Sequence, residues 1–302
     1  MNNKKLEKEI TLLVCTCDAY EDLWYPFFKM LNKYWNNCTL NIILNTETKT
    51  YNYEKLRIKS FPQNDNETYG ERMIRNLKHI DTKYTLLLLD DFFLRRNVDT
   101  EKLEKYLQIM EGDEAIDVIY FTKQILNQSF PSEHEGLEEL KKYAMYRLNM
   151  QAGLWRTDRL LNFWKPIDNP WKWEIFANYT TFDSAEKFLQ VEEDEESPFY
   201  YGYNPDGMGV FRGKWVYDDV APLFKENDIE IDYSIRGIYE KKTEKQYFSD
   251  KWDLLKYMLR RMPIKYVMGF LWFYTKKTII MKIGKSPRCM THCEYLINHM
   301  EE

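Results

Sequence analysis

The sequence predicts an α/β protein with a mostly parallel sheet flanked by helices, and two observations lead to this fold class. Residues 86–89 are four consecutive leucines, and an apolar run without alternation is typical of a central parallel strand covered on both faces. Strand-like apolar runs also alternate with segments of helical periodicity over the first 125 residues. That alternation is the order of a parallel sheet whose crossover connections are helices.

The elements of this first part follow one another regularly along the chain. Apolar runs rich in β-branched residues are expected as strands, and segments with apolar residues three and four positions apart are expected as helices. The predicted order is strand 10–17, helix 21–35, strand 39–45, helix 64–80, strand 84–89, helix 100–110 and strand 115–122.

The pattern becomes less regular after residue 123, so the second part is expected to have a different organisation. Short apolar runs here are separated by polar and acidic segments and by glycines. The predicted elements are a loop with a short helix over 124–142, a strand within 143–155, a helix near 171–179, short strands within 199–203 and 207–217, and a helix over 219–227.

Composition indicates a folded globular chain in a reducing compartment. The 302 residues are 44% hydrophobic and 16% aromatic, which disagrees with intrinsic disorder. Five irregularly spaced cysteines do not make a disulfide framework. The N-terminus lacks the apolar core of a signal peptide, and no run reaches the roughly 18 apolar residues of a membrane span. The expected location is therefore the cytoplasm.

Residues 246–302 are expected to form a helical, basic and aromatic tail. The chain has a net charge of −5, yet residues 251–290 contain ten Lys or Arg and one acidic residue. Apolar stretches bracketed by basic residues favour peripheral contact with an anionic membrane surface, here the inner face of the cell membrane. The alternative is a helix pair that packs on the body of the protein. Nucleic acid is disfavoured as a partner because the rest of the chain is acidic.

Two carboxylates directly follow the leucine run. In open α/β sheets ligands gather outside the carboxyl ends of the strands, which would bring Asp90 and Asp91 to the cleft. Adjacent carboxylates there suit a hard divalent cation that also binds phosphate oxygens. The alternative is an acidic turn that only ends the strand. The glycine-rich fingerprints of dinucleotide and P-loop sites are absent from the sequence.

The order of these parts resembles a known enzyme family. A strand ends at Thr16-Cys17-Asp18, a second ends at Asn45-Thr46-Glu47, and Gly70-Glu71-Arg72-Met73-Ile74-Arg75-Asn76-Leu77 precedes Leu89-Asp90-Asp91. This resembles the nucleotide-sugar-binding half of GT-A glycosyltransferases of the family 2 type, found in bacterial surface polysaccharide synthesis. The resemblance covers residues 9–125 and is weaker over 145–217. It implies a GT-A-like, Rossmann-type sheet, with residues 1–125 as the nucleotide-sugar half and 126–245 as the acceptor half of a 1–245 catalytic domain.

The resemblance also implies roles for residues of the donor side. Four residues would surround the nucleoside, namely Thr16, Asp18, Tyr20 and Asn45. Arg72 and Arg75 would lie near the diphosphate, where a guanidinium can form two parallel bonds to phosphate, or else belong to an exposed helix face. Asn76 would brace the loop beneath the acids.

A divalent cation, Mn²⁺ or Mg²⁺, is the implied cofactor, with Asp91 and Asp90 at the metal and the diphosphate. The chain departs from the family motif at one position, because Phe92 stands where the second aspartate of the motif is expected. Either Asp91 holds the cation together with the diphosphate, or the enzyme is metal-independent and uses arginines.

On the acceptor side, Glu174 lies about where related enzymes place their catalytic carboxylate. A general base must take the proton of the attacking hydroxyl, and apolar neighbours raise the pKa of a carboxylate toward that task. The alternative for Glu174 is a glutamate in a first helical turn, stabilised by the helix dipole. The residues assigned to acceptor binding are Gly153, Trp155, Trp173 and Lys214.

The resemblance therefore implies an inverting glycosyltransferase. Its donor would be a nucleotide sugar, with a UDP-sugar favoured, and its acceptor a carbohydrate, plausibly lipid-linked, in cell-surface polysaccharide synthesis. Two alternatives stay open: a catalytically silent relative that binds glycan or membrane, and a nucleotidyltransferase-like enzyme that uses the same acids.

Overall fold

The computed structural model describes residues 3–63, 66–123, 129–142, 144, 146–175, 177–181, 185–201 and 208–240, together with 268, 271, 272 and 275. Its strands are β1 (Ile10–Cys15), β2 (Asn41–Asn45), β3 (Arg57–Lys59), β4 (Tyr84–Leu89), β5 (Ile116–Tyr120), β6 (Ser129–Pro131), β7 (Leu137–Leu140), β8 (Gly153–Arg156), β9 (Lys187–Val191), β10 (Val210–Phe211) and β11 (Lys214–Trp215). The helices are α1 (Asn3–Glu9), α2 (Glu21–Tyr34), α3 (Tyr69–Lys78), α4 (Thr100–Gly112), α5 (Thr157–Phe163), α6 (Pro170–Ile175) and α7 (Tyr217–Glu226). Three single 3₁₀ turns lie at Asp18–Tyr20, Ala177–Thr181 and Asp194–Glu196.

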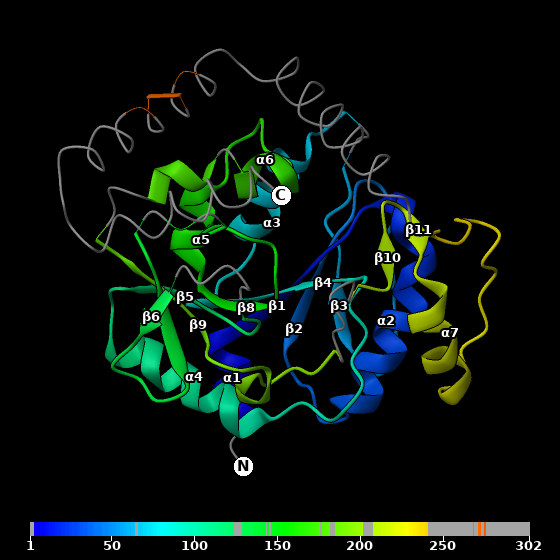
Figure 1. Cartoon of the computed structure of the whole chain (residues 1–302). Coiled ribbons are helices and arrows are strands. Elements are labelled where there is room, and N and C mark those ends of the chain that lie inside the picture. The colour runs from blue at the N-terminus through cyan, green and yellow to red at the C-terminus, as the bar shows by residue number, and fades with distance from the viewer. Residues whose placement is uncertain are drawn as a thin grey trace.

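Nine of the strands form one sheet in the order β3-β2-β1-β4-β8-β5-β9-β7-β6 (Figure 1). Strands β1 to β4 pair in parallel, and β5 and β9 are parallel to each other. The exceptions are β8, which is antiparallel to both β4 and β5, and β7, which is antiparallel to β9 and β6. Seven of the nine strands therefore run in one direction, with β8 and β7 opposed to them, and β8 joins the two parallel parts of the sheet.

Apolar layers cover both faces of this sheet. Alternate residues of β1 point to opposite sides, so that Leu12 and Val14 belong to one buried cluster and Leu13 and Cys15 to the other. The first cluster includes side chains of α2, α4 and α7, and the second includes side chains of α3, α5 and α6. Burial on both faces explains why the central strands β1 and β4 are largely apolar.

Local signals place helix α3 at the carboxyl ends of β1 and β2. The Thr68 hydroxyl accepts a hydrogen bond from the Glu71 amide, and the Glu71 side chain accepts one from the Thr68 amide, which is a capping box. Gly70 lets the chain of residues 165–168 approach closely, since a Cβ there would lie 2.1 Å from the Lys165 carbonyl oxygen. The start of α3 is thereby packed against the segment that leads into α6.

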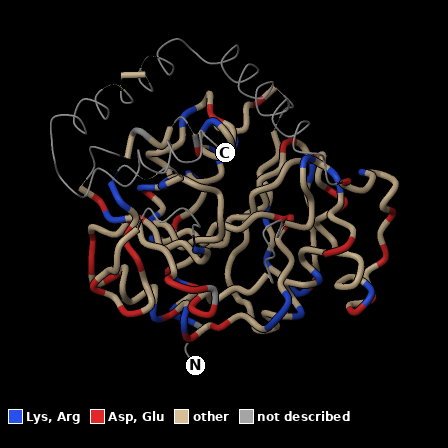
Figure 2. Tube along the Cα trace, viewed as in Figure 1, with Lys and Arg blue, Asp and Glu red and all other residues tan. Residues whose placement is uncertain are grey.

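The predicted fold class, an α/β sheet flanked by helices, is confirmed for the described residues. The strands and helices expected over the first 125 residues are all present, and α1 and β3 are additions that were not predicted from the sequence. The expected tail falls almost entirely outside the described residues. Acidic and basic positions are interspersed over the described part (Figure 2), and none of its helices has the length and apolar character needed to cross a membrane.

Predictions for the second part were wrong at several places. The described residues of 129–142 form the β6–β7 hairpin and no helix, and only the end of 143–155 is a strand, β8. Strand β9 was not expected, and residues 199–201 are not a strand. Strand β6 lies at the edge of the sheet with exposed positions, so that its apolar pattern is weak. Strand β9 lies between β5 and β7 and is mostly buried, but it has only five residues, among them Lys187 and Gln190.

Candidate active site at the carboxyl edge of the sheet

The acid pair follows β4 at the carboxyl edge of the sheet. Asp90 is 4% exposed, and its carboxylate accepts a hydrogen bond from the Thr16 hydroxyl at the end of β1. The Thr16 oxygen itself accepts a hydrogen bond of 2.8 Å from the Trp24 indole. Asp90 is therefore fixed to the neighbouring strand, whereas the half-buried Asp91 is the more accessible of the two acids.

Burial makes the charged forms of the acid pair unfavourable in the absence of a cation. Burial, and then the charge of Asp91, raise the pKa of Asp90 well above its ordinary value. Burial also raises the pKa of Asp91 to about 7, and the guanidinium of Arg236 opposes the rise at both acids. Two adjacent, desolvated carboxylates are the donor chemistry that Mg²⁺ or Mn²⁺ accepts. Phe92 is buried and packs edge-on against Tyr201, with ring centroids 5.6 Å apart.

Asp18 connects the ends of β1 and β2. Its carboxylate accepts hydrogen bonds from the Glu47 amide (3.0 Å), the Thr48 amide (3.0 Å) and the Thr48 hydroxyl (2.7 Å). Burial raises the pKa of Asp18, but these hydrogen bonds outweigh it and hold the pKa below its ordinary value. Asp18 is therefore an ionised group that shapes the loop after β2.

Asn45 and Asn76 form a buried brace between β2 and α3. The Asn76 amide donates a 2.6 Å hydrogen bond to the Asn45 side-chain oxygen, and both residues are fully buried. The Asn45 amide in turn lies 3.3 Å from the Met73 sulfur. The pair positions the strand ends from below, and neither side chain faces solvent.

The two arginines expected at the diphosphate are paired with carboxylates of the chain. Arg72 is 3% exposed and lies 2.6 Å from Glu47, with its guanidinium over the Tyr69 ring at 5.0 Å. Arg75 donates to Glu67 through its Nε (2.9 Å) and Nη2 (2.7 Å). Both guanidinium groups are thus neutralised locally.

Glu174 lies on α6 with a perturbed carboxyl group. Its Oε1 accepts a 2.8 Å hydrogen bond from the Met150 amide. Burial raises the pKa of Glu174 to about 7, and the Met150 hydrogen bond opposes the rise. A carboxyl group with such a pKa changes protonation near neutrality, which is the property a general base needs.

The topology brings Glu174 to the same edge of the sheet as the acid pair. Strand β8 is antiparallel to β4, with Gly153 opposite Leu87. Met150 precedes Gly153 by three residues, and Asp90 follows Leu87 by three. Because the strands run in opposite directions, both segments leave the sheet at one edge.

The residues assigned to the acceptor are placed in different environments. Gly153 lies in β8, where a Cβ would be 3.1 Å from the Tyr120 ring. Trp155 and Trp173 are fully buried with centroids 5.9 Å apart, and Trp173 stacks on Trp164 at 4.6 Å. Their rings pack in the core and present no face to solvent. Lys214 is exposed in the β10–β11 hairpin.

Two residues that the sequence did not single out belong to this region. Glu47 pairs with Arg72 and accepts a hydrogen bond from the Asp18 amide. Arg236 lies far along the chain, yet its guanidinium is 4.2 Å from the centroid of the Tyr20 ring. Glu47 comes soon after the end of β2, a position that favours a place at the carboxyl edge of the sheet. Nothing in the sequence around Arg236 indicates such a place.

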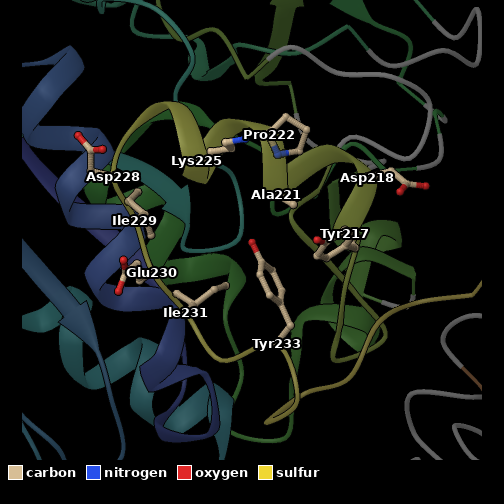
Figure 3. Close-up of a pocket in the computed structure, with 10 residues that line it drawn as sticks. All are labelled: Tyr217, Asp218, Ala221, Pro222, Lys225, Asp228, Ile229, Glu230, Ile231 and Tyr233. Carbon is tan, nitrogen blue, oxygen red and sulfur yellow. The ribbon is translucent and has the colours of Figure 1, made fainter.

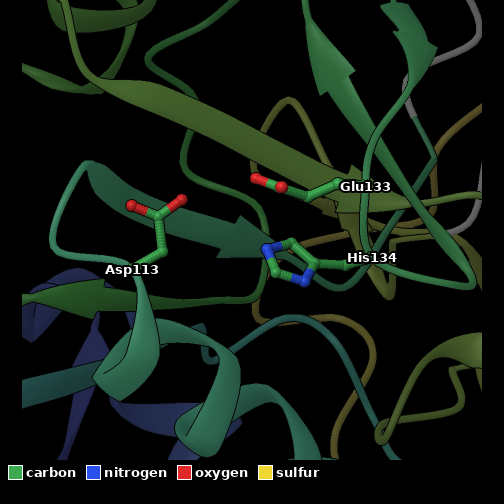
Figure 4. A group of neighbouring side chains, drawn as sticks. All are labelled: Asp113, Glu133 and His134. Carbon is green, nitrogen blue, oxygen red and sulfur yellow. The ribbon is translucent and has the colours of Figure 1, made fainter.

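A second acidic group, formed by Asp113, Glu133 and His134, lies elsewhere (Figure 4). Its ligand atoms are within 4.8 Å of one another. The Lys187 ammonium, however, is 2.8 Å from both the Asp113 and the Glu133 carboxylates. The lysine already balances the two carboxylates, so this group is an ion-pair network.

An open hollow of about 870 Å³ lies between α7 and the segment that follows it (Figure 3). Acidic side chains such as Asp218 and Glu230, apolar ones such as Ile231, and the rings of Tyr217 and Tyr233 line it. No residue of the strand ends contributes to it, so the hollow is separate from the acid pair.

Comparison with known proteins gives likenesses in fold only. No family model and no curated protein match the chain. Among solved structures, S. aureus TarS is similar with a TM-score of 0.45 and 13% identity, over 76% of this chain and 41% of that one. TarS 1-349 in complex with UDP-GlcNAc has a TM-score of 0.40 and 12% identity, over 76% of this chain and 69% of that one. The bifunctional IspDF from Campylobacter jejuni has a TM-score of 0.38 and 14% identity, over 66% of this chain and 53% of that one. The match spans 41% of the length of the TarS chain.

Proposed function

We propose that this chain is an inverting glycosyltransferase that moves a sugar from a nucleoside-diphosphate donor, preferably a UDP-sugar, to a hydroxyl of a carbohydrate acceptor. The observation that supports it is a pair of adjacent carboxylates, the buried Asp90 and the half-buried Asp91, at the same sheet edge as Glu174, a carboxyl group whose pKa burial raises to about 7. The acid pair suits a cation that also binds a diphosphate. Glu174 suits removal of a proton from an acceptor hydroxyl.

On the donor side, the nucleoside would lie over the ends of β1 and β2. Asp18 and Tyr20, in the turn after β1, would contact it, while the hydrogen-bonded Asn45 and Asn76 would support it from below. Asp91, together with Asp90, would hold a Mn²⁺ or Mg²⁺ ion, which when bound supplies positive charge to the leaving diphosphate. The hydrogen bond from Thr16 keeps Asp90 in place for this task.

On the acceptor side, Glu174 would act as the general base. The acceptor oxygen attacks the anomeric carbon while the bond from that carbon to the diphosphate oxygen breaks, and the hydroxyl proton passes to Glu174. One displacement of this kind inverts the anomeric configuration. Lys214 and the loop before Gly153 would border the acceptor, and the core positions of Trp155 and Trp173 assign them to support of α6 and β8.

Calorimetric titration of UDP, GDP and their common sugar conjugates, with Mn²⁺ and then with EDTA, tests the donor site. We expect one nucleotide to bind, and its affinity to fall at least tenfold with EDTA or in Asp91→Ala. The matched control is Asp113→Ala, which removes an acid of the Lys187 network and leaves binding unchanged. Binding that ignores EDTA would favour the metal-independent alternative, and absence of binding would contradict the proposal.

We also propose that the tail contacts an anionic membrane, where a lipid-linked acceptor would be found. The described tail residues Met268, Leu271 and Trp272 are helical and 61%, 50% and 70% exposed, and the surrounding sequence is basic. The spacing places them on one helix face, as expected of an interfacial segment.

Vesicle flotation of the full chain tests the membrane contact. We expect flotation with phosphatidylglycerol vesicles, little with phosphatidylcholine vesicles, and a marked loss in Trp272→Glu. Ile235→Glu is the control, because Ile235 is similarly exposed, 69%, but lies in the body of the protein. Equal flotation of all three proteins would contradict a role for this helix face.

A further inference from the structure

Arg236 belongs to a segment that returns from α7 to the carboxyl edge of the sheet. Its Nε donates a 2.8 Å hydrogen bond to the Asp22 carboxylate. Its Nη2 donates one hydrogen bond to the same carboxylate and a second, of 2.9 Å, to the Ala19 carbonyl. The guanidinium also lies over the rings of Tyr20 (4.2 Å) and Trp215 (5.9 Å). The arginine is therefore fixed against the turn that connects β1 with α2.

The same segment is tied to the acid pair through the β10–β11 hairpin. The Gly209 amide donates a 2.7 Å hydrogen bond to the Asp91 carbonyl, and the Trp215 amide donates a 3.0 Å hydrogen bond to the Gly237 carbonyl. Gly209 permits this approach, since a Cβ there would lie 2.3 Å from the Phe93 ring and 3.0 Å from the Asp91 carbonyl oxygen. Arg236 is thus held at the rim beside Asp91.

The guanidinium of Arg236 lies at the strand end that also holds Asp90. It is 4.2 Å from the centroid of the Tyr20 ring, in the turn that follows β1, and the Thr16 hydroxyl at the end of β1 donates to the Asp90 carboxylate. Arg72, Arg75 and Arg236 each pair with a carboxylate, namely Glu47, Glu67 and Asp22. Arg236 differs from the other two in its place against the turn between β1 and α2.

We propose that Arg236 binds the diphosphate of the donor, an inference that rests on the proposed function. Asp22 and Ala19 fix the Nε and Nη2 side of the guanidinium, whereas Nη1 makes one long hydrogen bond of 3.4 Å to the Gly213 carbonyl. A planar guanidinium with one edge fixed is preorganised to donate from the other edge to a phosphate oxygen. Asp22 is therefore a positioning residue, which holds the Arg236 guanidinium in place.

Calorimetry of each nucleoside diphosphate against its nucleoside isolates the contribution of the phosphates. UDP is compared with uridine and GDP with guanosine, on the full chain with Mn²⁺ present. We expect Arg236→Gln to weaken binding of the diphosphate by about 10- to 100-fold, as for loss of a charge-assisted hydrogen bond, and to leave nucleoside binding within about twofold. Arg236→Lys keeps the charge but not the planar guanidinium. Its affinity for the diphosphate should therefore lie between those of the wild type and Arg236→Gln.

The controls separate this inference from the proposed function. Arg57→Gln removes an exposed arginine that pairs with Glu7 and should bind like the wild type. Unchanged diphosphate affinity in Arg236→Gln would overturn the inference while the proposed function stands. Equal loss of nucleoside and diphosphate binding would also overturn it, since Arg236 would then only support the rim. A wild-type chain that binds neither UDP nor GDP would overturn both.

Discussion

Single side chains decide the chemistry at the carboxyl edge, and their partners could not be read from the sequence. Trp155 and Trp173 were expected to offer flat faces to a sugar, but both are fully buried. The sequence could not distinguish the two cases, because aromatic rings occur in cores as well as in binding faces. Arg72 and Arg75 were correctly placed on α3, yet Glu47 and Glu67 neutralise them. Which carboxylate meets an arginine depends on loop paths that leave no periodic pattern.

Glu174 carries the clearest prediction at this scale. Because a general base acts in its ionised form and the pKa of Glu174 is raised by burial to about 7, kcat/KM should rise with pH through about 7 and then level off. Glu174→Gln should lower kcat by about 10²- to 10⁴-fold and leave donor affinity nearly unchanged. Transfer rates and calorimetry over pH 5.5–8.5 check both expectations. A variant with wild-type kcat would exclude Glu174 as the base.

Asp117 provides a prediction about stability that is independent of function. It is buried in β5, both its carboxylate oxygens lack a hydrogen-bond partner within the described residues, and the Arg159 Nε is 3.6 Å away. Burial, and then Glu186, raise its pKa to about 7. The folded state therefore binds more protons than the unfolded state between about pH 4 and 7, and stability falls as pH rises through this window.

Asp117→Asn should accordingly stabilise the protein at pH 8, by roughly 1 to 3 kcal/mol, and progressively less as the pH is lowered toward 4. Urea denaturation at pH 8 and pH 5 measures the difference. The exposed variant Glu101→Gln on α4 is the control and should change little at either pH. A gain that is the same at both pH values would show that ionisation of Asp117 is not its source.

At the scale of elements, the sequence succeeded where each element carries its own periodic signal. The leucine run of β4 and the apolar faces of the helices α2 and α3 lie in the two buried clusters, as their sequence patterns predict. The antiparallel position of β8 could not be predicted, because its pairing with β4 and β5 joins residues about 70 and 35 positions apart. Strand β9 is short and flanked by acidic residues, so its apolar signal is weak.

The contact between α3 and the segment before α6 depends on Gly70. In Gly70→Ala the Cβ would lie 2.1 Å from the Lys165 carbonyl oxygen, and backbone cannot move aside cheaply. We expect a loss of about 1 to 3 kcal/mol in the free energy of unfolding. Gly112→Ala is the matched control, because a Cβ at this helical glycine meets nothing within 4 Å and should be neutral or slightly stabilising. Equal stability of the two variants would contradict this packing.

For the molecule as a whole, one mostly parallel sheet with β8 at its centre delivers two kinds of carboxyl group to one edge. The acid pair arrives on β4, and Glu174 is held through Met150 by the segment that enters β8. Arg236 and the β10–β11 hairpin close the rim from a distant part of the chain. The first two were predicted from the sequence, and the third required the fold.

The most direct test of the central claim is release of free nucleotide from a UDP-sugar panel by the full chain, with Mn²⁺ and without acceptor. We predict slow hydrolysis of one sugar nucleotide by the wild type, loss of at least 90% of that rate (roughly 1.4 kcal/mol or more in the activation free energy) in Asp91→Asn, and wild-type rates in Asp113→Asn. Hydrolysis that is equal in all three proteins, or absent from the wild type although it binds the nucleotide, would contradict a transferase site at Asp90 and Asp91.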